Sequence, residues 1–328
     1  MAGFRLRNNK WQARIQRDGY PNLAKSFDNK SDAIKWATKI EAEMDRGSYI
    51  NTSLAERTTF SELILRYLQE VTPKTKSAKE DGFRLRALAR KSIAKYNMIA
   101  LTPSRIAEYR DIRLREVTAG TVIRELAYFS CVINHARREW GINIDNPIPL
   151  IRKPETPPSR TRVLSDVEKD RLFNILKPRF KNSNPWILFI VQFALETAMR
   201  QGEILGLGWS DIDLNKRTAH LETTKNGDRR TVPLSSRAIQ ILQELPRSID
   251  GRVFPMNRPA LCANFESACK RAGIEDLHFH DLRHTAITNM ASKFSNILEL
   301  SAVTGHRQLS MLKRYYHPRA EDLALKLG

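Results

Sequence analysis

The first 50 residues alternate between apolar and polar positions before they change to a helical spacing. Trp11, Ala13 and Ile15 alternate with polar neighbours, which is typical of a strand with one buried face. Residues 23–27 predict a further strand, and residues 32–45 predict a helix. The apolar side of that helix is expected to consist of Ile34, Ala37, Ile40 and Met44. For residues 1–50 we expect a small three-stranded sheet, which includes these two strands, with one helix.

Apolar residues at helical spacing dominate residues 57–148, which predict a helical bundle. Thr59 and Glu62 have the spacing of a capping box at the start of its first helix. The longest apolar stripe predicts a helix over residues 119–140. Residues 149–163 lose this periodicity and are rich in proline and in basic side chains, so they predict an extended linker.

Residues 164–328 combine helical and strand patterns. A nearly continuous apolar run predicts a helix over residues 185–197. Two alternating segments flank Asn226-Gly227, which is a strong signal for a β-hairpin. Helical spacing then continues to the end of the chain. The predicted fold class is α+β and mostly helical, with a small antiparallel sheet in this last domain.

Charge adds a prediction about the partner. The 328 residues carry 55 Lys/Arg and 36 Asp/Glu, a formal net charge of +19, which favours a polyanion and most simply nucleic acid. Residues 1–40 hold nine Lys/Arg against three Asp/Glu, and the small sheet could enter a DNA major groove. The alternative is an ordinary solvated basic face. The basic side chains expected on the solvent side of the sheet are Arg5, Arg7, Lys10, Arg14 and Arg17.

Several classes of protein are disfavoured by what the sequence lacks. Its most apolar run, residues 186–195, is too short to span a membrane, and the first residues have no apolar signal-peptide segment. Three cysteines without a CxxC pair are typical of reduced thiols, so we expect a cytoplasmic, nucleoid-associated protein that does not contact a membrane. The sequence has no GxxxxGK[ST], GxSxG or HExxH motif.

Two groups of side chains are candidates for a metal site. Asp211 and Asp213 could hold Mg²⁺, but a turn between a helix and a strand explains them equally well. His280 and His284 are spaced as neighbours on one side of a helix, with His278 close by, and could bind zinc. Because no third ligand of suitable spacing is evident, the sequence favours no metal and no other cofactor.

A more specific pattern runs through the last domain. Arg200 and Glu203 lie one turn apart in "TAMRQGEILGL", and His280 and Arg283 lie one turn apart in "HDLRHT". Lys225 lies at the tip of the predicted hairpin. Further along, "TGHRQLSMLKRYYHP" contains His306 followed by two adjacent tyrosines, Tyr315 and Tyr316. Each feature alone has a structural explanation, such as a surface ion pair or a hydrogen-bonded histidine.

Taken together, these features resemble the tyrosine recombinase (phage integrase) family. That family places its active site on an Arg in a "TGMRxGE" segment, a hairpin Lys, an HxxR pair, a "GH" and a Tyr nine residues later. The resemblance carries these positions onto Arg200, Lys225, His280, Arg283, His306 and Tyr315. Ala198 and Thr304 depart from the common Gly and Leu, and neither is expected to touch a reacting group.

The resemblance implies a mechanism for breaking a DNA phosphodiester. Arg200, Arg283 and His306 would bind the non-bridging oxygens, and Tyr315 would attack to form a 3′-phosphotyrosine. His280 would be the general acid or base at that tyrosine, and Lys225 would protonate the leaving 5′-oxygen. Glu203 would orient Arg200 or His306. Since the covalent intermediate retains the phosphodiester energy, the mechanism needs neither ATP nor a metal.

The family also implies an architecture and partners. Residues 1–50 would bind arm sites on DNA, residues 57–148 the core site, and residues 164–328 would be catalytic. Four copies would form a synaptic tetramer on double-stranded DNA, with a host bending factor or an excisionase as accessory proteins, to integrate or excise a mobile element such as a prophage. The tail, residues 320–328, would dock on a neighbouring subunit or cover its own core. A type IB topoisomerase-like enzyme and a catalytically silent DNA-binding regulator are the alternatives.

The adjacent tyrosines lie in a stretch predicted to be helical. Neighbouring helical residues point about 100° apart, so only one hydroxyl can face a phosphate held by the arginines. The spacing from His306 selects Tyr315, and Tyr316 is expected to pack or to face solvent.

Overall fold

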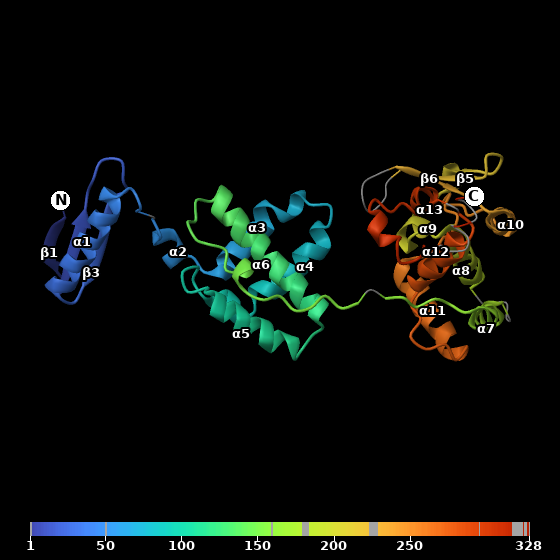
Figure 1. Ribbon diagram of the computed structural model, residues 1–328, viewed down its shortest axis with the longest axis horizontal. Helices are drawn as coiled ribbons and strands as arrows, with labels where there is room; N and C mark the ends of the chain where they lie inside the picture. Colours follow the sequence, from blue (N-terminus) through green and yellow to red (C-terminus); the bar gives the residue numbers. More distant parts are fainter. Residues whose placement is uncertain are drawn as a thin grey trace. The chain divides into compact units, whose positions relative to one another are not determined.

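The computed structural model describes residues 2–49, 51–158, 160–178, 184–222, 229–294 and 296–316, together with Ala324 and Leu327 (Figure 1). The chain divides into two compact units, Met1–Pro158 and Ser159–Gly328. Lys225, the hairpin turn at Asn226-Gly227 and nearly all of the tail from residue 317 onward lie outside the described residues.

The first unit begins with a three-stranded antiparallel sheet in the order β1-β2-β3, and α1 follows it. Their bounds are β1 Gly3–Arg7, β2 Lys10–Ile15, β3 Leu23–Phe27 and α1 Lys30–Asp45. The alternation predicted for β2 is confirmed, since Ala13 and Ile15 are buried against Ala33, Ala37 and Met44. The prediction for Ile34 was wrong because α1 buries the neighbouring Ala33 instead, and Ile34 is exposed.

The rest of the first unit is helical and has its own hydrophobic core. Its helices are α2 Ser53–Arg57, α3 Phe60–Glu70, η1 Thr72–Lys74, α4 Ala78–Ala89, η2 Ser92–Lys95, α5 Pro103–Leu114, α6 Ala119–Glu139 and η3 Ile148–Leu150. The predicted capping box is present, because Thr59 and Glu62 exchange hydrogen bonds with each other's backbone N–H. Phe129 of α6 packs between Phe60 and Tyr109 at the centre of this core.

The second unit combines helices with a small sheet in the order β4-β5-β6. Its helices are α7 Asp166–Leu176, α8 Trp186–Thr197, α9 Gln201–Gly206, η4 Trp209–Asp211, α10 Ser236–Glu244, α11 Arg258–Arg271, α12 Asp281–Ala291, α13 Ile297–Thr304 and η5 Leu309–Met311. Its strands are β4 Ile212–Asp213, β5 Thr218–Leu221 and β6 Arg230–Pro233. β5 and β6 pair antiparallel, as the hairpin pattern predicted.

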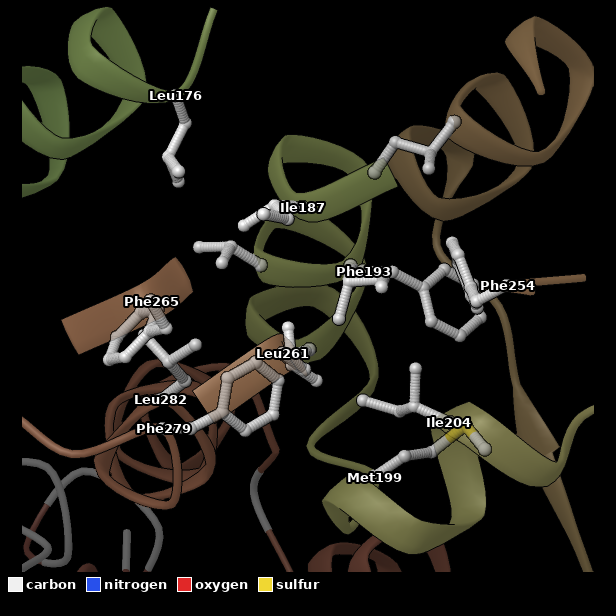
Figure 2. Close-up of a cluster of buried hydrophobic side chains, with 14 of the residues drawn as sticks. Leu176, Ile187, Phe193, Met199, Ile204, Phe254, Leu261, Phe265, Phe279 and Leu282 are labelled. Carbon is white, nitrogen blue, oxygen red and sulfur yellow. The ribbon is translucent and has the colours of Figure 1, made fainter. Parts of the chain in front are cut away.

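The apolar helix α8 lies at the centre of the second unit's core (Figure 2). Phe193 is fully buried on this helix and packs against Phe254, with ring centroids 5.3 Å apart. Phe265 and Phe279 form a second aromatic pair, at 5.5 Å, beside Leu282 of α12. Because α8 also packs against α12, it supports the helix that carries Arg283 of the candidate site.

The segment with the two tyrosines differs from its prediction. After η5 the backbone continues in turns, and the N–H groups of Tyr315 and Tyr316 bond to the carbonyls of Leu312 and Lys313, three residues back. The predicted α-helix is therefore wrong here. The side chain of Leu312 is fully buried in a small apolar cluster. This burial fixes the backbone here in turns, so the neighbouring residues do not continue a helix.

None of the described helices is both long enough and apolar enough to cross a membrane.

Candidate active site

A cavity of about 520 Å³ gathers five of the predicted catalytic residues from four separate segments. Those residues are Arg200, His280, Arg283, His306 and Tyr315. His284, Arg307 and Arg314 also line this cavity. The lining is therefore strongly cationic, which suits an anionic ligand. The sixth predicted residue, Lys225, lies outside the described part of the chain.

Glu203 joins two arginines at one end of the cavity. Its side chain is almost fully buried on α9, where its carboxylate accepts hydrogen bonds from Arg200 Nη1 at 2.8 Å and from Arg230 Nη2 at 2.7 Å. Burial opposes ionisation of Glu203, but the charge of Arg230 and the hydrogen bonds from Arg200 outweigh it and keep the pKa below its ordinary value. Glu203 therefore orients Arg200, as predicted, but its other partner is Arg230 of β6 instead of His306.

Arg283 is buried on α12 and is held through two backbone carbonyls. Its Nη2 donates to the carbonyl of Thr304 at 2.7 Å, and its Nη1 donates to the carbonyl of Ala198. No carboxylate is among these partners. Burial and the charges of Arg200 and Arg230 lower the pKa of Arg283 to about 9. A guanidinium in this environment is stabilised by any anion that enters the cavity.

Gly305 makes the close approach of Arg230 possible. Its backbone is left-handed, with φ +69°, and it ends α13. A Cβ at this position would lie 2.6 Å from Arg230 Nη1 and 2.9 Å from its Cδ. Arg230 Nη1 donates to the carbonyl of Val303 at 2.8 Å, directly below this turn. A side chain at residue 305 would therefore displace Arg230 from Glu203.

Thr304 fixes the ring of His306. Its hydroxyl donates to the carbonyl of Leu300 at 2.7 Å and lies 2.8 Å from His306 Nδ1. A hydroxyl has one proton, so both bonds form only if Nδ1 carries the proton of the neutral ring and donates it to Thr304. Nε2 is then the nitrogen that remains for a ligand. Burial and the charges of Arg283 and Arg200 lower the pKa of His306 to about 4.

The expectation that Thr304 touches no reacting group was wrong. Its hydroxyl contacts His306 and its carbonyl accepts from Arg283, so it supports two of the predicted site residues. Ala198, the other departure from the family pattern, adopts the left-handed conformation with φ +51° in which glycine is common. Its carbonyl is the second acceptor for Arg283.

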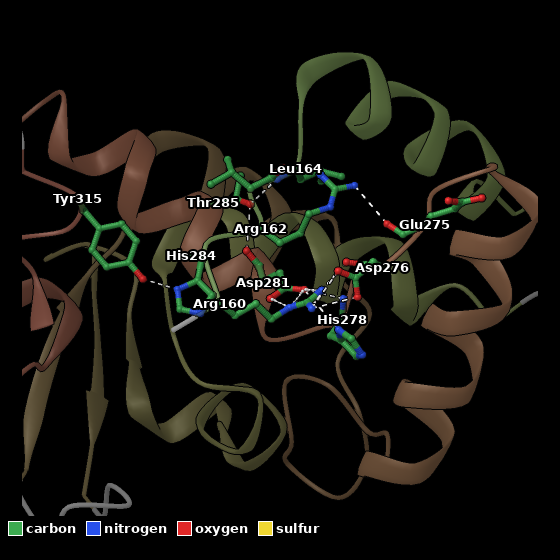
Figure 3. Close-up of polar contacts among 11 residues, drawn as sticks. Arg160, Arg162, Leu164, Glu275, Asp276, His278, Asp281, His284, Thr285 and Tyr315 are labelled. Carbon is green, nitrogen blue, oxygen red and sulfur yellow. Dashed lines mark hydrogen bonds and ion pairs between the residues drawn. The ribbon is translucent and has the colours of Figure 1, made fainter. Parts of the chain in front are cut away.

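Tyr315 is half-buried, and its hydroxyl is hydrogen-bonded to Nδ1 of His284 (Figure 3). Arg314 lies over the ring, with its Cζ 4.8 Å from the centroid, and the ring packs beside the apolar cluster that contains Leu312. Burial raises the pKa of Tyr315, although the charge of Arg314 opposes this. Tyr316 is partly buried, and it does not line the cavity.

Linker side chains hold the start of α12, which carries His280 and Arg283. Arg160 Nε donates to Asp281 at 2.8 Å, and its Nη1 donates to Asp276 at 3.0 Å (Figure 3). Asp281 is 1% exposed. The N–H of Leu164 adds a hydrogen bond to Thr285 at 2.9 Å. Within the extended linker that the sequence predicts over residues 149–163, the last residues are therefore held against this unit by side-chain contacts.

The two aspartates considered as Mg²⁺ ligands accept hydrogen bonds from backbone N–H groups. Asp211 accepts from the N–H of Gly208 and Asp213 from the N–H of Lys216, each at 2.8 Å, which agrees with the turn alternative. Among the residues that the structure describes, no group of three or more His, Cys, Asp or Glu side chains is arranged to hold a metal ion.

The predicted basic face of the first sheet is only partly as expected. Arg5, Arg7, Lys10 and Arg14 are exposed, and the register places them all on the face opposite α1. Arg17 lies beyond β2 and pairs with Asp45 at 2.6 Å, because the chain turns toward the end of α1 there. Arg17 is thus not a member of the sheet's basic face.

Three residues of the site were missed by the sequence interpretation: Arg230, His284 and Thr304. Arg230 is the first residue of β6. A charged residue at a strand position that faces the interior could have indicated a site residue. His284 was noted only as a zinc alternative, and its spacing of four from His280 puts it on the same side of α12. Thr304 gave no signal beyond its departure from the family pattern.

Comparison with known proteins supports one family. Residues 162–322 match the phage integrase family. The chain is 42% identical over 278 residues to a shufflon-specific DNA recombinase of Escherichia coli, covering 82% of this chain and 71% of that protein. It is 35% identical over 343 residues to a putative integrase/recombinase of Haemophilus influenzae, covering 100% of this chain and 91% of that protein.

Solved structures agree in fold. A lambda integrase dimer bound to a COC′ core site superimposes with a TM-score of 0.66 at 18% identity, covering 97% of this chain and 95% of that one. A Tn1549 transposon integrase bound to circular intermediate DNA gives 0.64 at 18% identity, covering 82% and 98%. With the cavity and its arginines, these matches show that the chain belongs to the phage integrase family of tyrosine recombinases and is a site-specific DNA recombinase.

Proposed function

We propose that this recombinase cleaves and rejoins DNA through a covalent 3′-phosphotyrosine on Tyr315. The observation that carries the proposal is the single cavity shared by Tyr315, Arg200, Arg283 and His306. Tyr315 supplies the nucleophilic hydroxyl, and the two arginines supply permanently charged donors for the non-bridging oxygens. The reaction places extra negative charge on these oxygens in the transition state, where fixed cationic donors stabilise it most.

The charge balance of the cavity supports a phosphodiester ligand. Arg200 and Arg230 share one carboxylate, Glu203, while Arg283 contacts two backbone carbonyls, so the three arginines carry excess positive charge. Burial, together with this excess of positive charge, lowers the pKa of His306 to about 4. A bound phosphate offsets these charges and raises that pKa, which allows Nε2 to gain a proton and donate to the phosphate. DNA binding should therefore be accompanied by proton uptake at neutral pH.

Two further residues occupy the sequence positions that the family pattern uses for proton transfer. Lys225, by its family position on the hairpin, would protonate the leaving 5′-oxygen. His280 lines the cavity at the start of α12 and is the acid–base group of the family pattern. Glu203 and Thr304 act on the arginines and on His306 through the contacts described above.

Covalent trapping tests this function. A nicked duplex that loses the short strand after cleavage should leave the protein attached to DNA on a denaturing gel. Since the tyrosyl phosphodiester keeps the bond energy, the adduct should form in excess EDTA and without ATP. A wild-type protein that binds DNA but forms no adduct would instead support a silent DNA-binding regulator. Adduct formation that stops on chelation and returns with Mg²⁺ would overturn the metal-independent mechanism.

The proposal extends to assembly and partners. Four copies would synapse two double-stranded core sites, while the basic sheet of residues 1–50 would bind arm sites. A lambda integrase tetramer bound to a Holliday junction has a fold similar to this chain, with a TM-score of 0.64 at 17% identity. A host bending factor or an excisionase would set the direction of integration or excision of a prophage, in the bacterial cytoplasm.

The 42% identity to a shufflon-specific DNA recombinase favours a second candidate substrate. On this alternative the same chemistry would act on a shufflon-type element instead of an integrating one. The two substrates can be distinguished by incubating the protein with fragments of host genomic DNA and sequencing the DNA that stays covalently attached. A shufflon-type element and an integrating element would give different attached sequences.

A further inference from the structure

The hydroxyl of Tyr315 has a histidine partner other than the one expected from the family pattern. His284 Nδ1 is hydrogen-bonded to this hydroxyl, and the two rings lie nearly parallel, with centroids 5.9 Å apart (Figure 3). Both residues line the cavity. The ring of His280 meets the ring of His284 edge-on at 5.3 Å. His284 therefore contacts the oxygen atom that would react.

The position of His284 is well defined by its surroundings. It is 8% exposed, within a fully buried stretch of α12 from Asp281 to Ile287. Its carbonyl accepts from the hydroxyl of Thr288 at 3.0 Å, and the start of the helix is tied down by Arg160. A group held in this way needs little reorganisation when the proton moves.

The direction of the hydrogen bond follows from the protonation states. The charged and titratable groups that face His284 are His280, Arg314, Asp281, Arg283 and Tyr315. Burial, followed by the charges of His280 and Arg314, lowers the pKa of His284 to about 4, so the ring is neutral at pH 7. Burial raises the pKa of Tyr315, so the phenol keeps its proton in the free protein. A phenol is the stronger donor and a neutral imidazole the stronger acceptor, so Tyr315 donates to Nδ1.

We propose that His284, instead of His280, accepts the proton of Tyr315 during strand cleavage. This rests on the proposed function above. As the Tyr315 oxygen bonds to phosphorus, its O–H bond breaks and the proton moves to His284 Nδ1, forming an imidazolium. The P–O bond to the 5′-oxygen breaks with its electron pair, and that oxygen takes a proton from the leaving-group acid. Rejoining reverses each transfer, so His284 returns the proton to Tyr315.

The phosphodiester makes this transfer favourable when it is needed. Burial, and after it the nearby positive charges, make His284 a weak base in the free protein. The negative charge that accumulates on the phosphate opposes them and raises the basicity of His284 as the tyrosine attacks. His280 is exposed at the start of α12 and also lines the cavity.

A substitution that keeps the acceptor but removes the basicity tests the proposal. In His284→Asn the amide oxygen can occupy the place of Nδ1, but it does not take up a proton. We expect single-turnover adduct formation on the nicked duplex to fall about 10²–10⁴-fold, with DNA binding unchanged. The wild-type rate should be nearly independent of pH between about 6 and 8, whereas the variant's rate should rise about tenfold per pH unit. His278→Asn makes the same exchange outside the cavity and is the matched control.

A modified substrate separates the two proton transfers. A bridging 5′-phosphorothiolate has a thiolate leaving group that needs no acid, so it should restore cleavage by Lys225→Ala but leave His284→Asn slow. Restoration of His284→Asn would place this histidine at the leaving group and overturn the proposal. An undiminished rate would also overturn it, and a faster rate would show that His284 restrains Tyr315.

A measurement on the wild-type protein is independent of any folding defect. Long-range ¹H–¹⁵N spectra should show His284 with its proton on Nε2 at pH 7, and the signals should shift in Tyr315→Phe. A proton on Nδ1 would contradict the proposed acceptor role. If Tyr315→Phe still formed a covalent adduct, the proposed function itself would fail, whatever His284 does.

Discussion

At the scale of single residues, the site depends on which side-chain atoms face the cavity. Tyr315 and Tyr316 are adjacent, but only Tyr315 lines the cavity and contacts His284. The turn that follows η5 decides this, because Leu312 is fully buried and fixes the direction of the chain.

The first prediction concerns these tyrosines. Tyr315→Phe should bind DNA normally and form no covalent adduct, because the nucleophilic oxygen is gone. Tyr316→Phe should still form the adduct and is the matched control. Denaturing electrophoresis with the nicked duplex, followed by peptide mapping of the DNA-linked residue, measures both. An adduct mapped to Tyr316 would show that the wrong nucleophile has been assigned.

The second prediction concerns Thr304. Thr304→Val keeps the shape of a fully buried side chain but removes the hydroxyl that accepts from His306. A net hydrogen bond contributes about 0.5–1.5 kcal/mol, so we expect adduct formation to slow about 2- to 13-fold. Thr304→Ser retains the hydroxyl and should cleave at nearly the wild-type rate. Equal loss in both variants would point to packing as the cause.

At the scale of elements, α12 connects the site to the segment that precedes the second unit's first helix. Arg160 reaches Asp281 and Asp276, while Arg162 contacts Glu168 and the carbonyl of Glu275. These contacts fix the first turn of the helix that positions His280 and Arg283. A loosened first turn should therefore affect catalysis before it affects DNA binding.

The third prediction tests this connection. Arg160→Gln leaves the buried Asp281 carboxylate without its guanidinium, and we expect the free energy of unfolding to fall by about 1–3 kcal/mol at pH 7. Lys153→Gln removes an exposed charge from the same segment and should change it little. Urea unfolding measures the difference. A stability equal to that of wild type would show that the pair contributes nothing.

The ion pair between Arg160 and Asp281 also makes the stability of the protein depend on pH. Burial opposes ionisation of Asp281, but the hydrogen bonds from Arg160 and the N–H of His278 outweigh it and lower the pKa. A lowered folded-state pKa stabilises the protein above the unfolded value of about 4, and this stabilisation is lost as the pH falls further. Wild type and Arg160→Gln should therefore differ at pH 7 and converge below about pH 4.

At the scale of the whole molecule, the candidate catalytic residues in the described chain all lie in the second unit, whereas the predicted arm-binding sheet lies in the first. The first unit contains two separate hydrophobic cores, one formed by the sheet with α1 and one by the helices that follow. The separate cores favour independent folding of the small sheet domain.

The fourth prediction follows from this division. Removal of residues 1–50 should spare cleavage at the crossover site and abolish binding to a second, distal DNA sequence. A charge-reduced full-length variant, Arg5→Gln with Arg14→Gln, alters only the exposed face of the sheet and is the control for folding. Footprinting with both DNA sites measures the outcome. Unchanged protection of both sites after the deletion would refute the arm-binding role.

The sequence by itself determined most of the elements of this protein and the family whose chemistry we propose for it. Alternation gave the strands, helical spacing gave the helices, and the capping box of Thr59 and Glu62 marked the beginning of one helix, because these signals depend on neighbours within a few residues. The family pattern located Arg200, Arg283, His306 and Tyr315 because a phosphodiester transition state requires those residue types.

Only the tertiary structure decided how these residues contact one another. Glu203 meets Arg230 across 27 positions, His284 meets Tyr315 across 31, and Arg283 meets Ala198 across 85. Local patterns contain no information on such pairs, since each depends on how α8, α12, α13 and the small sheet pack together. The same packing replaces the predicted helix at Tyr315 by turns, because burial of Leu312 outweighs the local preference for a helix.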